Sequence, residues 1–236
     1  MVELANEWSL APILRQYCLL IIRHMLFRNW VHIGSITVNK STLFGTIAVL
    51  PLIASGALAG TPSVLWDQSA TDGGFVFSES GSEMDSTAAA DDFVVPSGQT
   101  WLVKEMDVTG VYFNGSGPAK SQIITFYSNK NGKPGRIKQG PFTLKCTDNF
   151  GSFKCILPTR VKLKSGTWWV SLVANIDFSA GGEWGWNTNP TVQGNEAVWE
   201  EPGGQSCTTW TPLHVCFGGS PTDMAFKLLG RANESN

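Results

Sequence analysis

The chain has 236 residues, of which 17 are Lys or Arg and 19 are Asp or Glu, so its formal net charge is −2. This acidic balance argues against a nucleic-acid-binding protein, which needs a basic surface. Only three histidines are present, and His214 alone follows residue 60, so neither a zinc centre nor a histidine-based catalytic triad is expected.

The first predicted element is a leader with a signal peptide over residues 1–59. It ends in an apolar, uncharged run in which Ala57 and Ala59 supply the small side chains that signal peptidase accepts. We expect cleavage after Ala59, a mature domain over residues 60–236, and contact with the membrane only through the leader before cleavage. An uncleaved anchor is the alternative, and Met25 is a second candidate for the start.

Short strands separated by turns are predicted along the mature domain. In Thr167–Asp177 apolar residues alternate over five positions, which is typical of a strand with one face in the core. In Thr100–Phe113 the parity of the apolar residues changes near Lys104 and Glu105, which predicts a β-bulge there. The other expected strands are Val64–Asp67, Gly74–Ser78, Asp91–Val95, Ser121–Ser128, Glu183–Asn187, Glu196–Trp199 and Asp223–Leu229. This pattern predicts an all-β, two-sheet antiparallel β-sandwich of jelly-roll-like form.

Four cysteines in the mature domain form two pairs with the same spacing, Cys146 with Cys155 and Cys207 with Cys216. An even number of cysteines behind a leader predicts two local disulfides in an oxidising compartment. The first pair is expected to face each other across a hairpin that reverses near Phe150. We therefore expect the protein to be secreted or periplasmic.

Four tryptophans in the C-terminal third are the candidate ligand-binding residues: Trp184, Trp186, Trp199 and Trp210. Indole rings on a rigid sandwich can stack on sugar rings, and Trp184 and Trp186 share a face if their segment is extended. The alternative is that these large side chains form a second core at the end of the sandwich.

Scattered carboxylates suggest calcium as a weaker possibility. The candidate ligands are Asp67, Asp91, Asp92 and Asp223, which lie at the ends of predicted strands. Calcium needs six or more oxygens, whereas aspartate beside a strand is commonly a turn residue. No other cofactor is expected.

Several stretches resemble a class of uncharacterised secreted bacterial β-sandwich proteins. The matching segments are DDFVVPSGQTW at 91–101, NGKPG at 131–135, WGW at 184–186 and CTTW at 207–210. The resemblance implies a bacterial, exported module, and no catalytic residue is carried over from it.

The leading hypothesis is therefore an exported, non-catalytic structural or interaction module, with an extracellular polysaccharide or a surface protein as partner. One alternative is a carbohydrate-binding protein that uses the tryptophans. The other is a glycosidase that pairs Glu183 with Glu196 or Glu200, since glycoside hydrolysis needs only two carboxyl groups.

Overall fold

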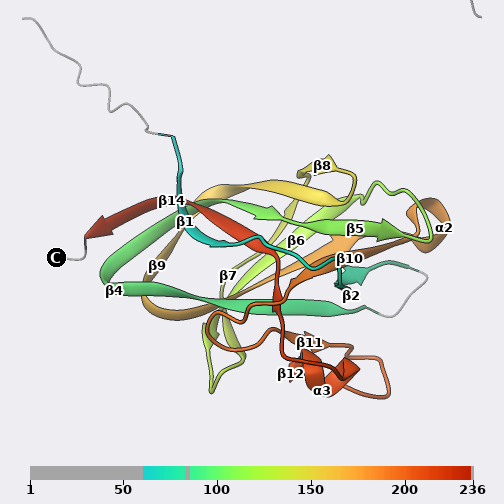
Figure 1. Cartoon of the computed structure of the whole chain (residues 1–236). Coiled ribbons are helices and arrows are strands. Elements are labelled where there is room, and N and C mark those ends of the chain that lie inside the picture. Colours follow the sequence, from blue (N-terminus) through green and yellow to red (C-terminus); the bar gives the residue numbers. More distant parts are fainter. Residues whose placement is uncertain (1–60, 83–85, 235–236) are drawn as a thin grey trace, which may run out of the picture. The chain divides into compact units, whose positions relative to one another are not determined.

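A computed structural model of the chain describes residues 61–82 and 86–234, and the predicted leader lies outside them. The predicted all-β sandwich is confirmed (Figure 1). Its strands are β1 (Ser63–Gln68), β2 (Phe75–Phe77), β3 (Glu79–Ser80), β4 (Ala88–Val108), β5 (Gly110–Phe113), β6 (Ser121–Asn129), β7 (Pro134–Leu144), β8 (Thr147–Asn149), β9 (Ser152–Asn175), β10 (Glu183–Asn189), β11 (Val198–Glu200), β12 (Thr211–Pro212), β13 (Asp223–Met224) and β14 (Phe226–Glu234). Two short helices, α2 (Phe178–Gly181) and α3 (Leu213–Phe217), complete it, and no helix of the described residues is long and apolar enough to cross a membrane.

The larger sheet follows the order β1-β14-β4-β9-β6-β7, and β3, β8, β11 and β12 pair at its sides. Its pairs are antiparallel, except that β3 runs parallel to β9. The smaller sheet has β10 at its centre, bonded to β2, β5 and β13.

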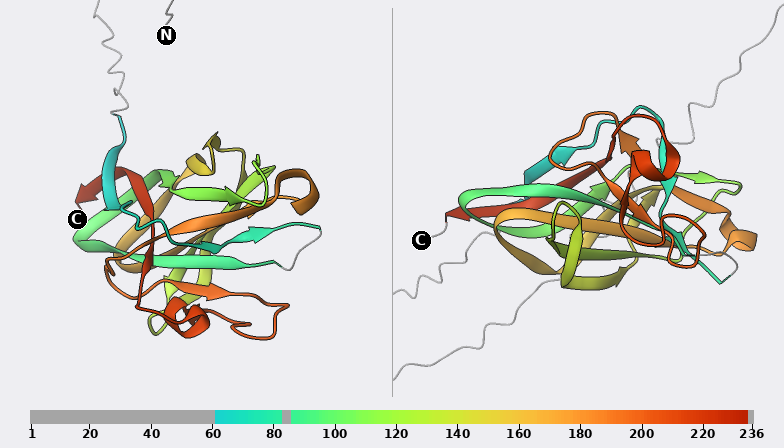
Figure 2. Two further views of the ribbon diagram at one scale, coloured as in Figure 1. Left: turned by 45° about the vertical axis from the view of Figure 1, so that its right-hand side comes forward. Right: turned by 90° about the horizontal axis from the view of Figure 1, so that it is seen from below.

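Strands β4 and β9 form the longest pair of the larger sheet. They pair from Ala90 with Ser171 to Val108 with Phe153, and the register shifts where β4 passes from Val95 to Thr100. At that end both strands turn back across the molecule (Figure 2). The sequence led us to expect separate strands at Asp91–Val95 and Thr100–Phe113, but β4 is continuous through the turn and breaks at Thr109 instead.

The predicted β-bulge is confirmed, because Val103 and Glu105 of β4 pair with the adjacent residues Gly230 and Leu229 of β14, which leaves Lys104 as one extra residue in β4. The predicted alternation in β9 is confirmed as well, since Val170, Leu172 and Ala174 are buried in the main core.

Trp168 is the first of the five alternating apolar residues predicted to face the core, but it is only partly buried. Its neighbour Trp169, on the opposite face, is fully buried with Ala90 and Val198 in a second apolar cluster. That cluster forms because the segment carrying β11 covers the face of β9 on which Trp169 lies. Alternation within one strand cannot show that a distant segment covers this second face.

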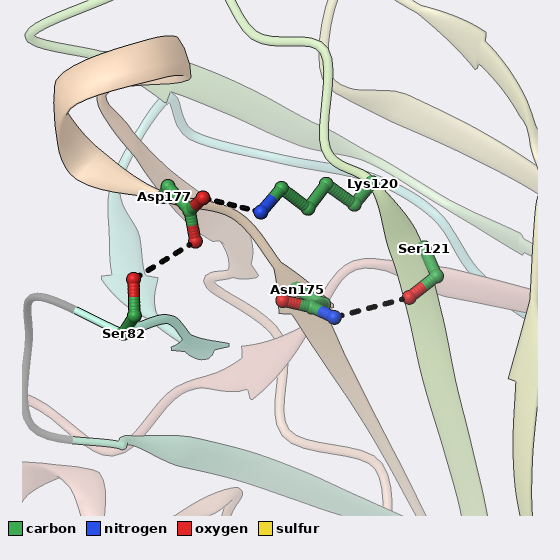
Figure 3. Close-up of polar contacts among 5 residues, drawn as sticks. All are labelled: Ser82, Lys120, Ser121, Asn175 and Asp177. Atoms are coloured by element: carbon green, nitrogen blue, oxygen red, sulfur yellow. Dashed lines mark hydrogen bonds and ion pairs between the residues drawn. The ribbon is translucent and has the colours of Figure 1, made fainter.

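Polar contacts join the end of β9 to two other parts of the chain (Figure 3). Asp177, just after β9, pairs with Lys120 and accepts a hydrogen bond of 3.3 Å from Ser82. Asn175 donates to the hydroxyl of Ser121 in β6 at 3.4 Å. These contacts fix the end of the sandwich from which α2 projects.

Both predicted disulfides are present. Cys146 and Cys155 lie 4.5 Å apart between Cα atoms, and Cys207 and Cys216 lie 6.0 Å apart. The first hairpin reverses at Phe150 and Gly151, as predicted, since Asn149 pairs with Ser152.

Candidate functional site

Three of the four tryptophans of the predicted platform lie in the interior, so the prediction is wrong for Trp184, Trp186 and Trp199. Trp184 and Trp186 are fully buried, and Trp199 is 7 % exposed. Each indole N–H donates to a backbone carbonyl oxygen: Trp184 to Gly151 at 2.8 Å, Trp186 to Ala225 at 3.0 Å, and Trp199 to Phe77 at 2.8 Å. A buried indole N–H needs such a partner, and none of these three rings offers a free face to a sugar.

Trp210 is partly buried beside the second apolar cluster. Its ring meets Tyr127 edge to face, with centroids 6.0 Å apart, and its carbonyl oxygen accepts a hydrogen bond from Lys133. It therefore holds the C-terminal loop against the larger sheet.

The four predicted calcium ligands do not form one site. Asp67 lies at the surface and pairs with Lys227 at 3.0 Å. Asp91, Asp92 and Asp223 are buried near one another, and they accept hydrogen bonds from the backbone N–H groups of Met224, Asn195 and Gln193, respectively. Among the described residues, Asp223 Oδ1 has no hydrogen-bond partner. Across residues 61–82 and 86–234, no three His, Cys, Asp or Glu side chains are grouped so that they could hold a metal ion.

Burial and mutual repulsion perturb these carboxyl groups. Burial, helped by the charge of Asp223, raises the pKa of Asp91 well above its usual value. Burial also raises the pKa of Asp223 to about 7, with a further contribution from the charge of Asp92. Asp223 and Asp92 order the neighbouring loop, because they accept hydrogen bonds from the backbone N–H groups of Gln193 and Asn195, respectively.

The carboxylates suggested for glycoside hydrolysis are held in separate contacts. Glu183 accepts a hydrogen bond of 2.6 Å from the side-chain amide of Asn114. Glu196 binds both the backbone N–H and the ring Nδ1 of His214, at 2.7 and 2.5 Å. Burial raises the pKa of Glu200.

Glu79 is an acidic group that the sequence did not single out. It is 3 % exposed and accepts a hydrogen bond of 2.5 Å from the backbone N–H of Trp184. Burial raises its pKa to about 7, and the charge of Glu183 adds to the effect.

The outer face of the smaller sheet presents three phenylalanines. Trp184 and Trp186 of β10 point into the core, so Gly185 between them faces outward. Residues that pair across a sheet point to the same side. Phe77 pairs with Gly185, Phe75 with Asn187 and Phe113 with Glu183, so these side chains share that outer face.

We call Phe75, Phe77 and Phe113 the phenylalanine face. Their ring centroids lie 5.7, 5.9 and 6.4 Å apart, and Phe113 is 46 % exposed. A Cβ atom on Gly185 would lie 2.2 Å from the ring of Phe75, so only glycine lets this ring lie across β10. Glu183 and Asn187 place polar groups on the same face.

The clamped β8–β9 hairpin lies beside this sheet. Its Gly151 packs against the backbone of Val111 in β5, and the neighbouring Phe150 is 92 % exposed. Phe75 and Phe77 are two residues apart, so in a strand they share one face. This spacing is the sequence signal that could have revealed the phenylalanine face, whereas the sequence pattern predicts only a short strand there.

Comparison with known proteins identifies no family. No family model matches the chain, and no curated protein matches it. Among solved structures, it is similar to the cysteine protease and lectin-like domains of Cwp84, a surface layer associated protein of Clostridium difficile. The TM-score is 0.40 and the identity 11 %, over 63 % of this chain and 32 % of that one. A similarity of this size does not identify a function.

Proposed function

We propose that this chain is an exported, non-catalytic binding module that takes a polysaccharide on its phenylalanine face. The observation that supports this most directly is the cluster of partly exposed rings over Gly185. Large side chains exposed together on a folded protein mark a contact surface.

A carbohydrate fits this surface better than a purely apolar partner. Sugar rings present apolar C–H faces and a rim of hydroxyl groups, so they need both stacking surfaces and hydrogen-bonding partners. Aromatic rings provide the first, and the partly exposed carboxylate of Glu183, which also binds Asn114, lies on the same face for the second.

Export is supported by the two disulfides, because such bonds persist in oxidising compartments and are rare in the cytosol. The absence of catalysis is part of the proposal. It is supported by the separate engagement of Glu183 with Asn114 and of Glu196 with His214.

The test is depletion of the purified chain by insoluble cellulose, chitin and peptidoglycan. We expect Phe113→Ser to weaken binding to the polysaccharide that retains the wild type by about tenfold, since one hot-spot side chain commonly contributes that much. Phe178→Ser is the matched control, because Phe178 is exposed to a similar extent, 44 %, but belongs to α2.

Equal loss in both variants, or no retention of the wild type, would overturn the proposal. The proposal would also be overturned if the wild type released soluble sugars from one of the three polymers and either Glu183→Gln or Glu79→Gln abolished that release. That result would identify the glycosidase instead.

A further inference from the structure

Five cations gather on another outer surface of the sandwich, which we call the basic face. They are Lys104, Arg160, Lys162, Lys164 and Arg231, carried by β4, β9 and β14. All but Lys104 are exposed. The chain as a whole has more acidic than basic residues, so this gathering is a local segregation of charge.

The strand register explains why these side chains lie together. Arg231 pairs with Leu102, which pairs with Lys162 on its other side, so the three point to the same face. In the next row Asn233 pairs with Thr100, which pairs with Lys164. On β9, Val161 and Leu163 alternate with the lysines and are buried in the core.

Two hollows lie on the basic face and share Leu102 as part of their floor. One, of about 480 Å³, is lined by Thr100, Leu102, Lys162, Lys164, Ser165, Asn233 and Glu234. The other, of about 30 Å³, is lined by Pro62, Leu102, Lys104, Arg160, Gly230 and Arg231. Together they form a shallow surface that crosses three strands.

These cations lack acidic partners within the part of the chain that the structure describes. The ion pairs there join Lys120, Lys154, His214 and Lys227 to carboxylates, and none of them uses the basic face. Lys104 donates only to the backbone carbonyl oxygen of Leu157. Glu105, the nearest carboxylate along β4, is engaged by Lys154 at 2.7 Å, and Glu234 lines the larger hollow.

Clustered like charges repel one another, and an anionic ligand would relieve that repulsion. The cations spread over three strands and surround a shallow floor, which suits an extended polymer with repeated negative charges rather than one small anion. Ser165 and Asn233 also line the larger hollow and add polar groups for a hydroxyl-rich chain.

We propose that the basic face is a second binding site, separate from the phenylalanine face, and that it holds an acidic polysaccharide. The choice of a polysaccharide rests on the proposed export of the protein. It is also favoured by the lining residues, none of which is aromatic, whereas single-stranded nucleic acid is commonly held by stacking of its bases on aromatic rings.

The experiment measures binding of the purified chain to heparin, polygalacturonate, neutral dextran and a 20-base-pair DNA duplex at two salt concentrations. We expect binding to at least one acidic polysaccharide, none to dextran, and weakening as salt increases. Lys162→Glu combined with Lys164→Glu is expected to reduce that affinity at least tenfold. Lys162→Arg combined with Lys164→Arg is expected to retain it.

The matched control is Arg136→Glu combined with Lys138→Glu, which makes the same change of charge on exposed positions of β7. A greater loss in this control than in the β9 pair would place the site on β7 and overturn the proposal. So would an absence of binding to either acidic polysaccharide, or tighter binding to the DNA duplex.

The two proposals fail independently. Phe113→Ser is expected to leave binding to acidic polymers unchanged, because Phe113 does not line either hollow on the basic face. Lys162→Glu combined with Lys164→Glu is likewise expected to leave unchanged the retention of the chain by whichever insoluble polysaccharide binds the phenylalanine face.

Discussion

At the scale of single residues, the disagreement between sequence and structure concerns which aromatic rings are exposed. Trp184 and Trp186 are the larger side chains, and they occupy the core, where Trp184 stacks on Phe153 with centroids 5.1 Å apart. The smaller rings of Phe75 and Phe77 remain at the surface of the same sheet. Alternation predicted that the two tryptophans share a face, but one strand cannot show which face is covered.

Phe150 combines high exposure with an unusual backbone. Its φ angle is 53°, in the left-handed region that residues other than glycine rarely adopt, and its side chain is 92 % exposed. We expect Phe150→Asn to increase the free energy of unfolding by about 0.5–1 kcal/mol, because asparagine tolerates this conformation better. Urea denaturation measures the change, and a loss of stability would show that the phenylalanine ring contributes packing at this turn.

At the scale of elements, the Cys146–Cys155 disulfide closes the β8–β9 hairpin against β5. Cross-linking a loop of this length stabilises a fold by about 2–3 kcal/mol, chiefly by restricting the unfolded chain. We therefore expect Cys146→Ser combined with Cys155→Ser to lower the free energy of unfolding by that amount while the far-ultraviolet circular dichroism stays that of a β-protein.

The matched comparison is wild type measured with and without a reductant. Reduction is expected to lower stability by at least as much as the double substitution, because it also opens the Cys207–Cys216 bond. An unchanged midpoint in both experiments would show that the bonds stabilise neither hairpin nor loop.

Elements were predictable from the sequence where one local signal was sufficient. The bulge near Lys104, the reversal at Phe150 and both cysteine pairs followed from parity, turn residues and spacing. The basic face was not predictable in this way. It depends on the register that sets Arg231 beside Leu102 and Lys162, which are far apart in the sequence.

At the scale of the whole molecule, buried carboxyl groups without cationic partners make stability depend on pH. Burial raises the pKa of Glu79 and of Asp223 to about 7 in the folded state. Each group therefore keeps its proton in the folded protein over a range in which the unfolded chain has lost it. By linkage, these two groups lower the free energy of unfolding as pH rises from about 4 to about 7, and their contribution levels off above that.

Glu79→Gln tests this dependence, because glutamine retains an oxygen that can accept the hydrogen bond from Trp184. We expect the variant to be more stable than wild type at pH 8, by on the order of 2 kcal/mol, and to show a shallower loss of stability between pH 5 and pH 8. Asp177→Asn is a suitable control, since the pKa of Asp177 is lowered by its pairing with Lys120 and the group is already ionised over this range. If stability changes with pH in the same way in the wild type and in Glu79→Gln, the raised pKa of Glu79 is contradicted.

The position of β14 has a consequence for how the protein is made. This strand, near the end of the chain, lies between β1 and β4. The larger sheet is therefore incomplete until Phe226–Glu234 has been synthesised, although β4 can already pair with β9. Removal of this strand would leave β1 without its hydrogen-bonded neighbour, so one late segment joins the first strand to the rest of the sheet.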